Sequence, residues 1–186
     1  MKKNFKIYLN APITLLFVIM CLMTIVLDSV TNGASTELFF STYKSSWLNP
    51  LTYVRLVGHC LGHKDLAHLV SNCLYLLLLG PILEEKYHDK LIIVIVVTAV
   101  VTGLFHNLVQ PEVMLLGSSG VVFAFILLAS ITGKEDGIPI TLILVAILWL
   151  GQEIYSGLTT SDNISQLTHI VGGLSGALLG LRFKRK

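Results

Sequence analysis

Apolar stretches long enough to cross a lipid bilayer recur along the chain and limit its fold more than any other feature. Hydrophobic residues make up 54% of the 186 residues and charged residues 13%, about half the charged share of a soluble domain. A spanning helix needs about 20 mostly apolar residues. We therefore expect an all-α membrane protein, a six-transmembrane-helix bundle with helices at residues 11–27, 66–83, 91–109, 118–131, 138–155 and 164–181.

The six apolar stretches account for most of the sequence, so residues 1–186 are expected to form a single integral membrane domain. A long outer loop at residues 28–65 is expected to be polar and irregular, and its aromatic residues suit a membrane interface. The first apolar run also fits a signal peptide, because it follows a basic N-terminus. Its length and the absence of a clear cleavage site favour a spanning helix.

Basic residues gather at the two ends of the chain and predict its orientation. With six spans both ends lie on one side of the membrane, and the positive-inside rule makes that side cytoplasmic. The basic residues concerned are Lys2, Lys3, Lys6, Arg182, Lys184, Arg185 and Lys186. We expect a multi-pass protein of the cell membrane with cytoplasmic termini.

Four polar side chains within the apolar stretches are predicted to lie at one depth. Such groups are costly in a membrane, so a functional role is the default interpretation. With a rise of about 1.5 Å per residue, Ser119 lies about 21 Å and His169 about 20 Å from the cytoplasmic ends of their helices. Asn72 lies at about 18 Å and His68 at about 24 Å. A cavity open to the outer side could reach all four.

Small residues predict that the helices carrying Ser119 and His169 pack closely. Small residues let helix backbones approach each other, and each of these helices has a stripe of them along one face. If the two stripes meet, Ser119 comes within hydrogen-bond reach of His169. A neutral imidazole can then take the serine proton. None of the 11 acidic residues falls at this depth, so a dyad without a carboxylate is expected. The stripes are Gly172, Gly173, Gly176 and Gly180 beside His169, and Gly117, Gly120 and Ala124 near Ser119.

These motifs, taken in order, resemble those of one family. The sequence is similar to the rhomboid intramembrane serine proteases of the minimal six-helix type, which predicts a rhomboid-like bundle. Each motif alone is weak, whereas the ordered set is specific. The matching residues are Arg55 in the outer loop, His68-x-x-x-Asn72, Gly80 followed by Glu84, Gly117-Ser118-Ser119-Gly120, and His169-x-x-Gly172.

The resemblance implies a role for each matching residue. Ser119 would attack the scissile carbonyl, and His169 would act as general base and then general acid. His68, Asn72 and the backbone N–H of Ser119 would stabilise the oxyanion. The implied substrates are membrane proteins cut in or near a transmembrane segment within the lipid bilayer, with no metal, other cofactor or nucleic acid. Residues implied in supporting positions are Gly117, Gly120, Phe123, Gly172 and Arg55.

Three positions depart from the family pattern. Val54 precedes Arg55 where a tryptophan is usual, which weakens the anchoring of the outer loop, and Arg55 itself is interpreted as tying the loop to the helices. Phe123 replaces a tyrosine that stacks on the catalytic histidine, so stacking is expected without the hydroxyl. Pro81 follows Gly80 in place of a second glycine, which is tolerable near a helix end.

Structural interpretations of the same residues stay open. Ser118 or Ser119 could act only as the N-cap of the fourth helix, because serine is favoured there. We expect Ser118 to cap the helix while Ser119 reacts. His169 alone could be a packing or hydrogen-bonding histidine, and Asn72 alone a contact between helices.

A metal site is a weaker alternative. His59, His63 and His68 lie near one another in the sequence, but their spacing is loose and no H-E-x-x-H motif is present. Glu84 and Glu85 are interpreted as a solvated helix end.

Two other functions compete with the protease for the whole chain. One is a catalytically silent rhomboid-like protein that binds transmembrane helices for trafficking or quality control. The other is a solute transporter, which the missing internal repeat disfavours. A protease would need water at its buried site, so a cavity with a mobile gate is expected, formed by residues 155–163 and the upper end of the fifth helix.

Overall fold

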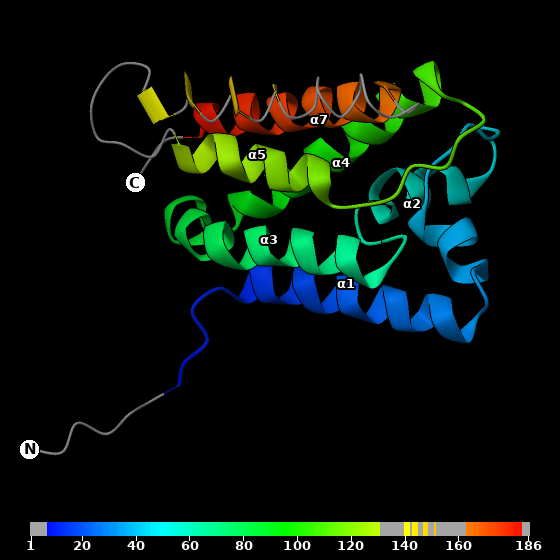
Figure 1. Cartoon of the computed structure of the whole chain (residues 1–186), viewed down its shortest axis with the longest axis horizontal. Coiled ribbons are helices and arrows are strands. Elements are labelled where there is room, and N and C mark those ends of the chain that lie inside the picture. Colours follow the sequence, from blue (N-terminus) through cyan, green and yellow to red (C-terminus); the bar gives the residue numbers. More distant parts are fainter. Residues whose placement is uncertain are drawn as a thin grey trace, which may run out of the picture.

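The computed structural model describes residues 7–130, 140–141, 143–144, 147–148, 151 and 163–183 (Figure 1). The named elements of these residues are all helices. They are α1 (Pro12–Val30), the short π-helix η1 (Thr36–Phe40), α2 (Pro50–Gly58), α3 (Leu66–Tyr87), α4 (Lys90–Val109), α5 (Ser119–Ser130) and α7 (Asn163–Arg182).

The helices agree with most of the predicted spans. Within the described residues, α1, α3 and α4 are long and apolar enough to cross a membrane, and α5 is a shorter apolar helix. The predicted helices at 11–27, 66–83, 91–109, 118–131 and 164–181 correspond to α1, α3, α4, α5 and α7. The predicted helix at 138–155 falls largely outside the described residues. The arrangement is that of a helical membrane protein, and the count of six spans stays a prediction.

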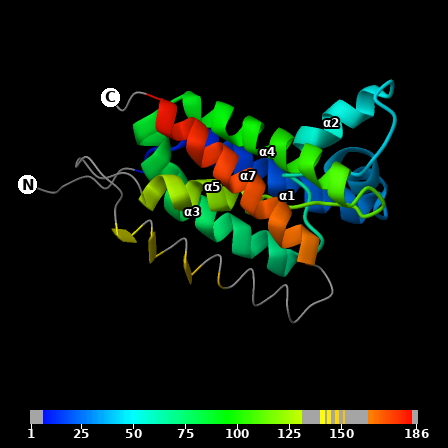
Figure 2. The same ribbon diagram turned by 90° about the horizontal axis from the view of Figure 1, so that it is seen from above.

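Helix α7 packs most extensively against α4 and α5, whereas α3 packs between α1 and α5. Figure 2 shows α7 running obliquely across its neighbours. The N-terminal ends of α3, α5 and α7 lie at the same end of the bundle as α2 (Figure 1). The first residues of three helices therefore meet at one end of the molecule.

Glycines let α7 approach its neighbours, but only part of the predicted contact between the two stripes is confirmed. A Cβ built on Gly176 would lie 2.9 Å from the Cβ of Ala124 on α5, as expected. A Cβ on Gly120, in contrast, would lie 3.1 Å from the hydroxyl of Thr102 on α4, and one on Gly172 would overlap the same hydroxyl. The prediction that Gly120 faces α7 is therefore wrong, because the α4 threonine fills the space between the two helices.

The outer segment 28–65 is more regular than predicted, since it contains η1 and α2. Asn49 caps α2 through a 3.0 Å bond from the backbone N–H of Leu51, and Pro50 is the first helical residue. This pairing is a common helix start. The irregular-loop prediction is wrong here because it gave weight to polarity and overlooked that signal.

The outer segment also holds the chain that leads into α5. Thr42 and Leu115 form an isolated antiparallel bridge, with N–H···O distances of 2.8 and 2.9 Å. Two residues later, the backbone N–H of Gly117 donates to the carbonyl of His59 at 2.9 Å. The start of α5 is thus positioned by residues more than 50 positions earlier in the chain.

At the opposite end, Glu84 joins α3 to α1. Its carboxylate accepts from the backbone N–H groups of Ile13 and Thr14 at 2.8 and 2.9 Å and from the Thr14 hydroxyl at 2.8 Å. The two backbone N–H groups lie in the first turn of α1 and have no acceptor within the helix. Glu84 is buried, so its interpretation as a solvated helix end is wrong, although the exposure of Glu85 agrees with it.

Candidate active site

Ser119 and His169 form a hydrogen bond, with 2.9 Å between Oγ and Nε2. Ser119 is the first residue of α5, and His169 lies on α7. Both side chains are half-buried. The close approach predicted from helix depth and small residues is confirmed for this pair.

The ring of Phe123 packs against α7 one turn from His169. Phe123 is buried, and a Cβ added to Gly173 would overlap its ring. Residues 169 and 173 are four apart and share a helix face. Phe123 therefore fills the space between α5 and α7 one helical turn after His169. This place is close to the supporting position expected for Phe123.

Ser118 contacts a different histidine. Its hydroxyl lies 3.3 Å from His63 Nε2, and the Asn72 Nδ2 lies 3.1 Å from the same nitrogen. The other ring nitrogen, Nδ1, lies 3.1 Å from the carbonyl of Leu61. Ser118, His63 and Asn72 are 0%, 2% and 6% exposed. This buried cluster lies directly beside the half-buried nucleophile candidate.

Ser118 also occupies the N-cap position of α5, as expected. Its carbonyl accepts from the backbone N–H of Val122 at 2.9 Å, and the helix begins at the next residue. The hydroxyl, however, contacts His63 and so links α5 to the segment before α3.

The ring of His63 is neutral in this environment. Burial and, second to it, the neighbouring His68 ring lower the pKa of His63 to about 4, although the bond to Leu61 acts in the opposite direction. The rings of His63 and His68 meet edge to face, with 5.0 Å between centroids. In the sequence His63 stood out only as a weak metal candidate. No periodic signal could reveal its role, because it lies in the non-helical segment before α3.

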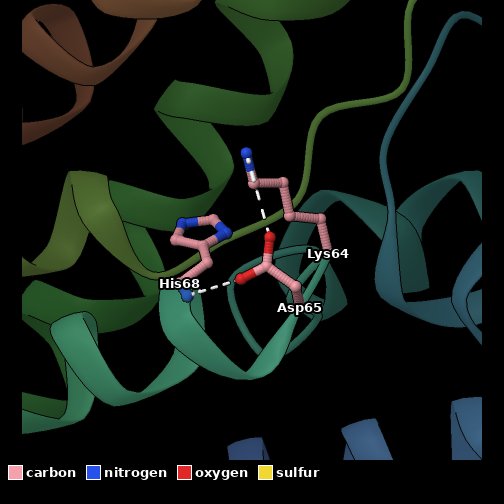
Figure 3. Close-up of polar contacts among 3 residues, drawn as sticks. All are labelled: Lys64, Asp65 and His68. Carbon is pink, nitrogen blue, oxygen red and sulfur yellow. Dashed lines mark hydrogen bonds and ion pairs between the residues drawn. The ribbon is translucent and has the colours of Figure 1, made fainter.

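The first turn of α3 positions His68. Asp65 is the N-cap of this helix, and its Oδ1 accepts from the backbone N–H of His68 at 2.7 Å (Figure 3). Its other oxygen faces Lys64 Nζ at 4.0 Å. The bond from His68 N–H is the main reason that the pKa of the Asp65 carboxyl is lowered. The charged carboxylate is a strong cap for the helix that carries His68 and Asn72.

Gly117 separates the side chains of His68 and Ser119. It has a φ of +131°, which disfavours other residues. A Cβ there would lie 2.8 Å from His68 Cε1, 3.0 Å from His68 Nε2 and 3.7 Å from Ser119 Oγ. Glycine at this position therefore lets the His68 ring approach the start of α5.

A cavity of about 520 Å³ opens beside these residues. His68 and His169 both border it, so it reaches the Ser119–His169 pair from the end of the bundle where α3 begins. The lining residues are Lys64, Asp65, Ala67, His68, Ser71, Met114, Leu115, Leu116 and His169.

Arg55 does not join this group. It is buried, and its guanidinium donates to the Tyr43 hydroxyl at 3.1 Å and to the Ser45 hydroxyl at 2.8 Å. Its guanidinium carbon also lies 4.5 Å from the centre of the Tyr43 ring. It therefore supports the outer segment itself. The predicted gate, residues 155–163 with the upper end of the fifth helix, falls almost entirely outside the described residues.

Comparison with known proteins agrees with this arrangement. The family model of the rhomboid domain matches residues 50–186. The rhomboid protease GlpG of Yersinia pseudotuberculosis serotype I (strain IP32953) is 29% identical over 175 residues, covering 90% of this chain and 61% of that protein. GlpG of Yersinia pestis (strain Pestoides F) matches with the same values. Rhomboid-related protein 1 of Caenorhabditis elegans is 29% identical over 137 residues, covering 68% of this chain and 38% of that protein.

This chain spans 61% of the length of the GlpG relatives that it matches. The family model covers well over half of the chain and includes every residue of the candidate site. This membrane protein therefore belongs to the rhomboid family.

Proposed function

We propose that this protein is an intramembrane serine endopeptidase that cuts transmembrane or membrane-adjacent segments of membrane proteins with a Ser119–His169 dyad. The observation that carries the proposal is the 2.9 Å hydrogen bond between Ser119 Oγ and His169 Nε2 beside a cavity that His169 lines. The GlpG relatives, which are named proteases, support the same reaction class.

The chemistry follows from this pair. His169 Nε2 accepts the proton of Ser119 as Oγ attacks the scissile carbonyl, which forms a tetrahedral oxyanion. His169 then gives that proton to the leaving amine, and the C–N bond breaks to leave an acyl-enzyme. Water enters from the cavity, loses a proton to His169 and attacks the acyl carbonyl. The ester C–O bond to Ser119 then breaks, which releases the acid product, and His169 returns the proton to Ser119 Oγ. Within the described residues, no acidic side chain is hydrogen-bonded to His169, so the proposal is a dyad.

The oxyanion is stabilised by donors around the start of α5. The backbone N–H of Ser119 is in the first turn, where helix N–H groups have no acceptor within the helix. His68 lies across Gly117 from Ser119, and Asn72 belongs to the adjoining buried cluster. Removal of one such donor typically costs about 2.7–4 kcal/mol of transition-state stabilisation.

The same proposal includes the orientation in the membrane. The outer segment and the N-terminal ends of α3 and α5 lie at one end of the bundle (Figure 1), and residues from the start of α3 and the segment before α5 line the cavity. The basic residues near the two chain ends favour a cytoplasmic position for both termini. The site then opens to the outer side of the cell membrane, where water is available for deacylation.

Labelling with a serine-directed fluorophosphonate probe tests the nucleophile. We expect the purified wild type to be labelled and Ser119→Ala to be unlabelled. Ser130→Ala is a matched control, because Ser130 ends the same helix and its hydroxyl bonds to the carbonyl of Ile126 at 2.8 Å. That variant should be labelled at the wild-type rate.

Equal labelling of the wild type and Ser119→Ala would refute the dyad. Failure of both proteins to be labelled while folded would also refute it. A catalytically silent rhomboid-like protein that binds transmembrane helices would then be the better interpretation.

A further inference from the structure

His63 has hydrogen-bond partners that determine its protonation. A carbonyl oxygen can only accept, so the contact of Nδ1 with Leu61 O places the ring proton on Nδ1. Nε2 then carries a lone pair. The Ser118 hydroxyl and the Asn72 amide share this one lone pair as donors, at 3.3 and 3.1 Å, and His63 is a neutral acceptor for both.

This protonation also determines which end of the Asn72 amide faces His63. An acceptor at Nε2 requires the NH₂ group, in agreement with the 3.1 Å distance from Asn72 Nδ2. An amide nitrogen has two hydrogens. One is taken by His63 and the other stays free to donate, so the orientation that His63 imposes leaves Asn72 able to bind an oxyanion.

Ser118 is the second group that His63 holds. It directly precedes Ser119, and its hydroxyl contact with His63 connects the start of α5 to the segment between α2 and α3. The backbone bond from Gly117 to His59 supports the same connection at 2.9 Å. A shift of about 1 Å in a reacting group can cost about a hundredfold in rate, so this anchoring bears directly on the position of Ser119.

We infer that His63 is a positioning residue for the proposed proteolysis: it holds the Asn72 amide with one N–H directed to the oxyanion and holds Ser118 so that Ser119 stays in line with His169. The inference rests on the proposed function. His63 contacts no reacting atom and acts through Asn72 and Ser118. Its burial, at 2% exposed, keeps water from replacing either bond.

A double-mutant cycle tests whether His63 acts through Asn72. The variants are His63→Leu, which fills the space without an acceptor, Asn72→Ala, and the two combined. The readout is cleavage of a model transmembrane substrate, with kcat and KM measured separately. We expect His63→Leu to lower kcat about tenfold to a hundredfold with KM within about twofold. In the Asn72→Ala background the same change should lower kcat by a clearly smaller factor, because only the part that acts through Ser118 remains and residues that act as a unit are non-additive.

His63→Gln is the conservative variant, because its side-chain carbonyl can accept from the same two donors. It should recover most of the kcat lost in His63→Leu. If His63→Leu does not fold, His63→Ala, which also removes the acceptor, replaces it in the cycle, and its kcat loss must again be smaller in the Asn72→Ala background.

Three results would overturn the inference. They are wild-type kcat in a folded His63→Leu or in its replacement His63→Ala, equal kcat losses with and without Asn72, and a His63→Gln that recovers none of the lost kcat. Fluorophosphonate labelling of wild type and Ser119→Ala runs in parallel. If labelling does not depend on Ser119, the proposed function fails; if it does and His63 shows no coupling, only this inference fails.

Discussion

Ser118 and Ser119 are neighbours in the chain, yet each contacts a different histidine in a different environment. Ser119 is half-buried and bonded to His169 on α7, next to a cavity. Ser118 is fully buried, and its hydroxyl shares His63 with Asn72. In the proposed mechanism, a serine–histidine contact alone is therefore not enough to make a nucleophile. Access to a cavity separates the reactive candidate from the anchoring one.

Substitution of His169 and of His63 should have the largest effects, one on cleavage and the other on stability. His169→Ala should lower cleavage of a model transmembrane substrate by at least about a thousandfold, because Ser119 loses its base. Its melting temperature should stay near that of the wild type, since His169 is only half-buried. His63→Ala should lower stability by about 1–3 kcal/mol for each buried partner left unsatisfied.

Activity and thermal unfolding are measured on the same preparations of the two histidine variants. If His169→Ala unfolds, His169 has a structural role, and the contrast between the Ser119–His169 and Ser118–His63 pairs is lost.

Removal of the Ser118 hydroxyl should have an intermediate effect. Ser118→Ala loses one contact to His63 at 3.3 Å but keeps the Asn72 contact and the N-cap carbonyl. We expect a loss of about 0.5–1.5 kcal/mol in stability and cleavage within about tenfold of wild type. Thermal unfolding measures the stability, cleavage of the model transmembrane substrate measures the activity, and fluorophosphonate labelling reports on the nucleophile. A loss of labelling as complete as that of Ser119→Ala would contradict the assignment of separate roles.

The pH dependence of stability should show the smallest effect. Burial lowers the pKa of His63 from 6.5 to about 4, so the unfolded chain binds a proton at a pH where the folded chain does not. Stability should therefore fall as pH drops from about 6.5 to about 4, and the effect of this group is complete below its folded pKa. Burial lowers the pKa of His59 to about 4 as well, so both histidines contribute in the same direction.

Melting temperatures of wild type and His63→Gln across this pH range isolate the contribution of His63. The slope should be shallower in the variant. Parallel curves would mean that His63 is not a neutral buried acceptor.

The sequence predicted the elements of the fold better than the contacts between them. Five of the six predicted spans correspond to described helices, because apolar length and helical periodicity are local properties. The alignment of Ser119 with His169 followed from helix rise and is confirmed. The contact of Glu84 with the start of α1 was missed, since it joins residues 70 and 71 positions apart, and a polar helix end carries no signal of its partner.

The sequence alone determined the membrane-protein class and the main helices, and it predicted a common depth for Ser119, His169, His68 and Asn72, because these depend on the composition and rise of single segments. The tertiary structure decided which histidine serves which serine. It turned Gly120 toward the threonine side chains of α4, and it brought His63 behind Asn72 and Ser118. These contacts depend on how the non-helical segments reverse direction and how three helices share space, which no local pattern in the chain encodes.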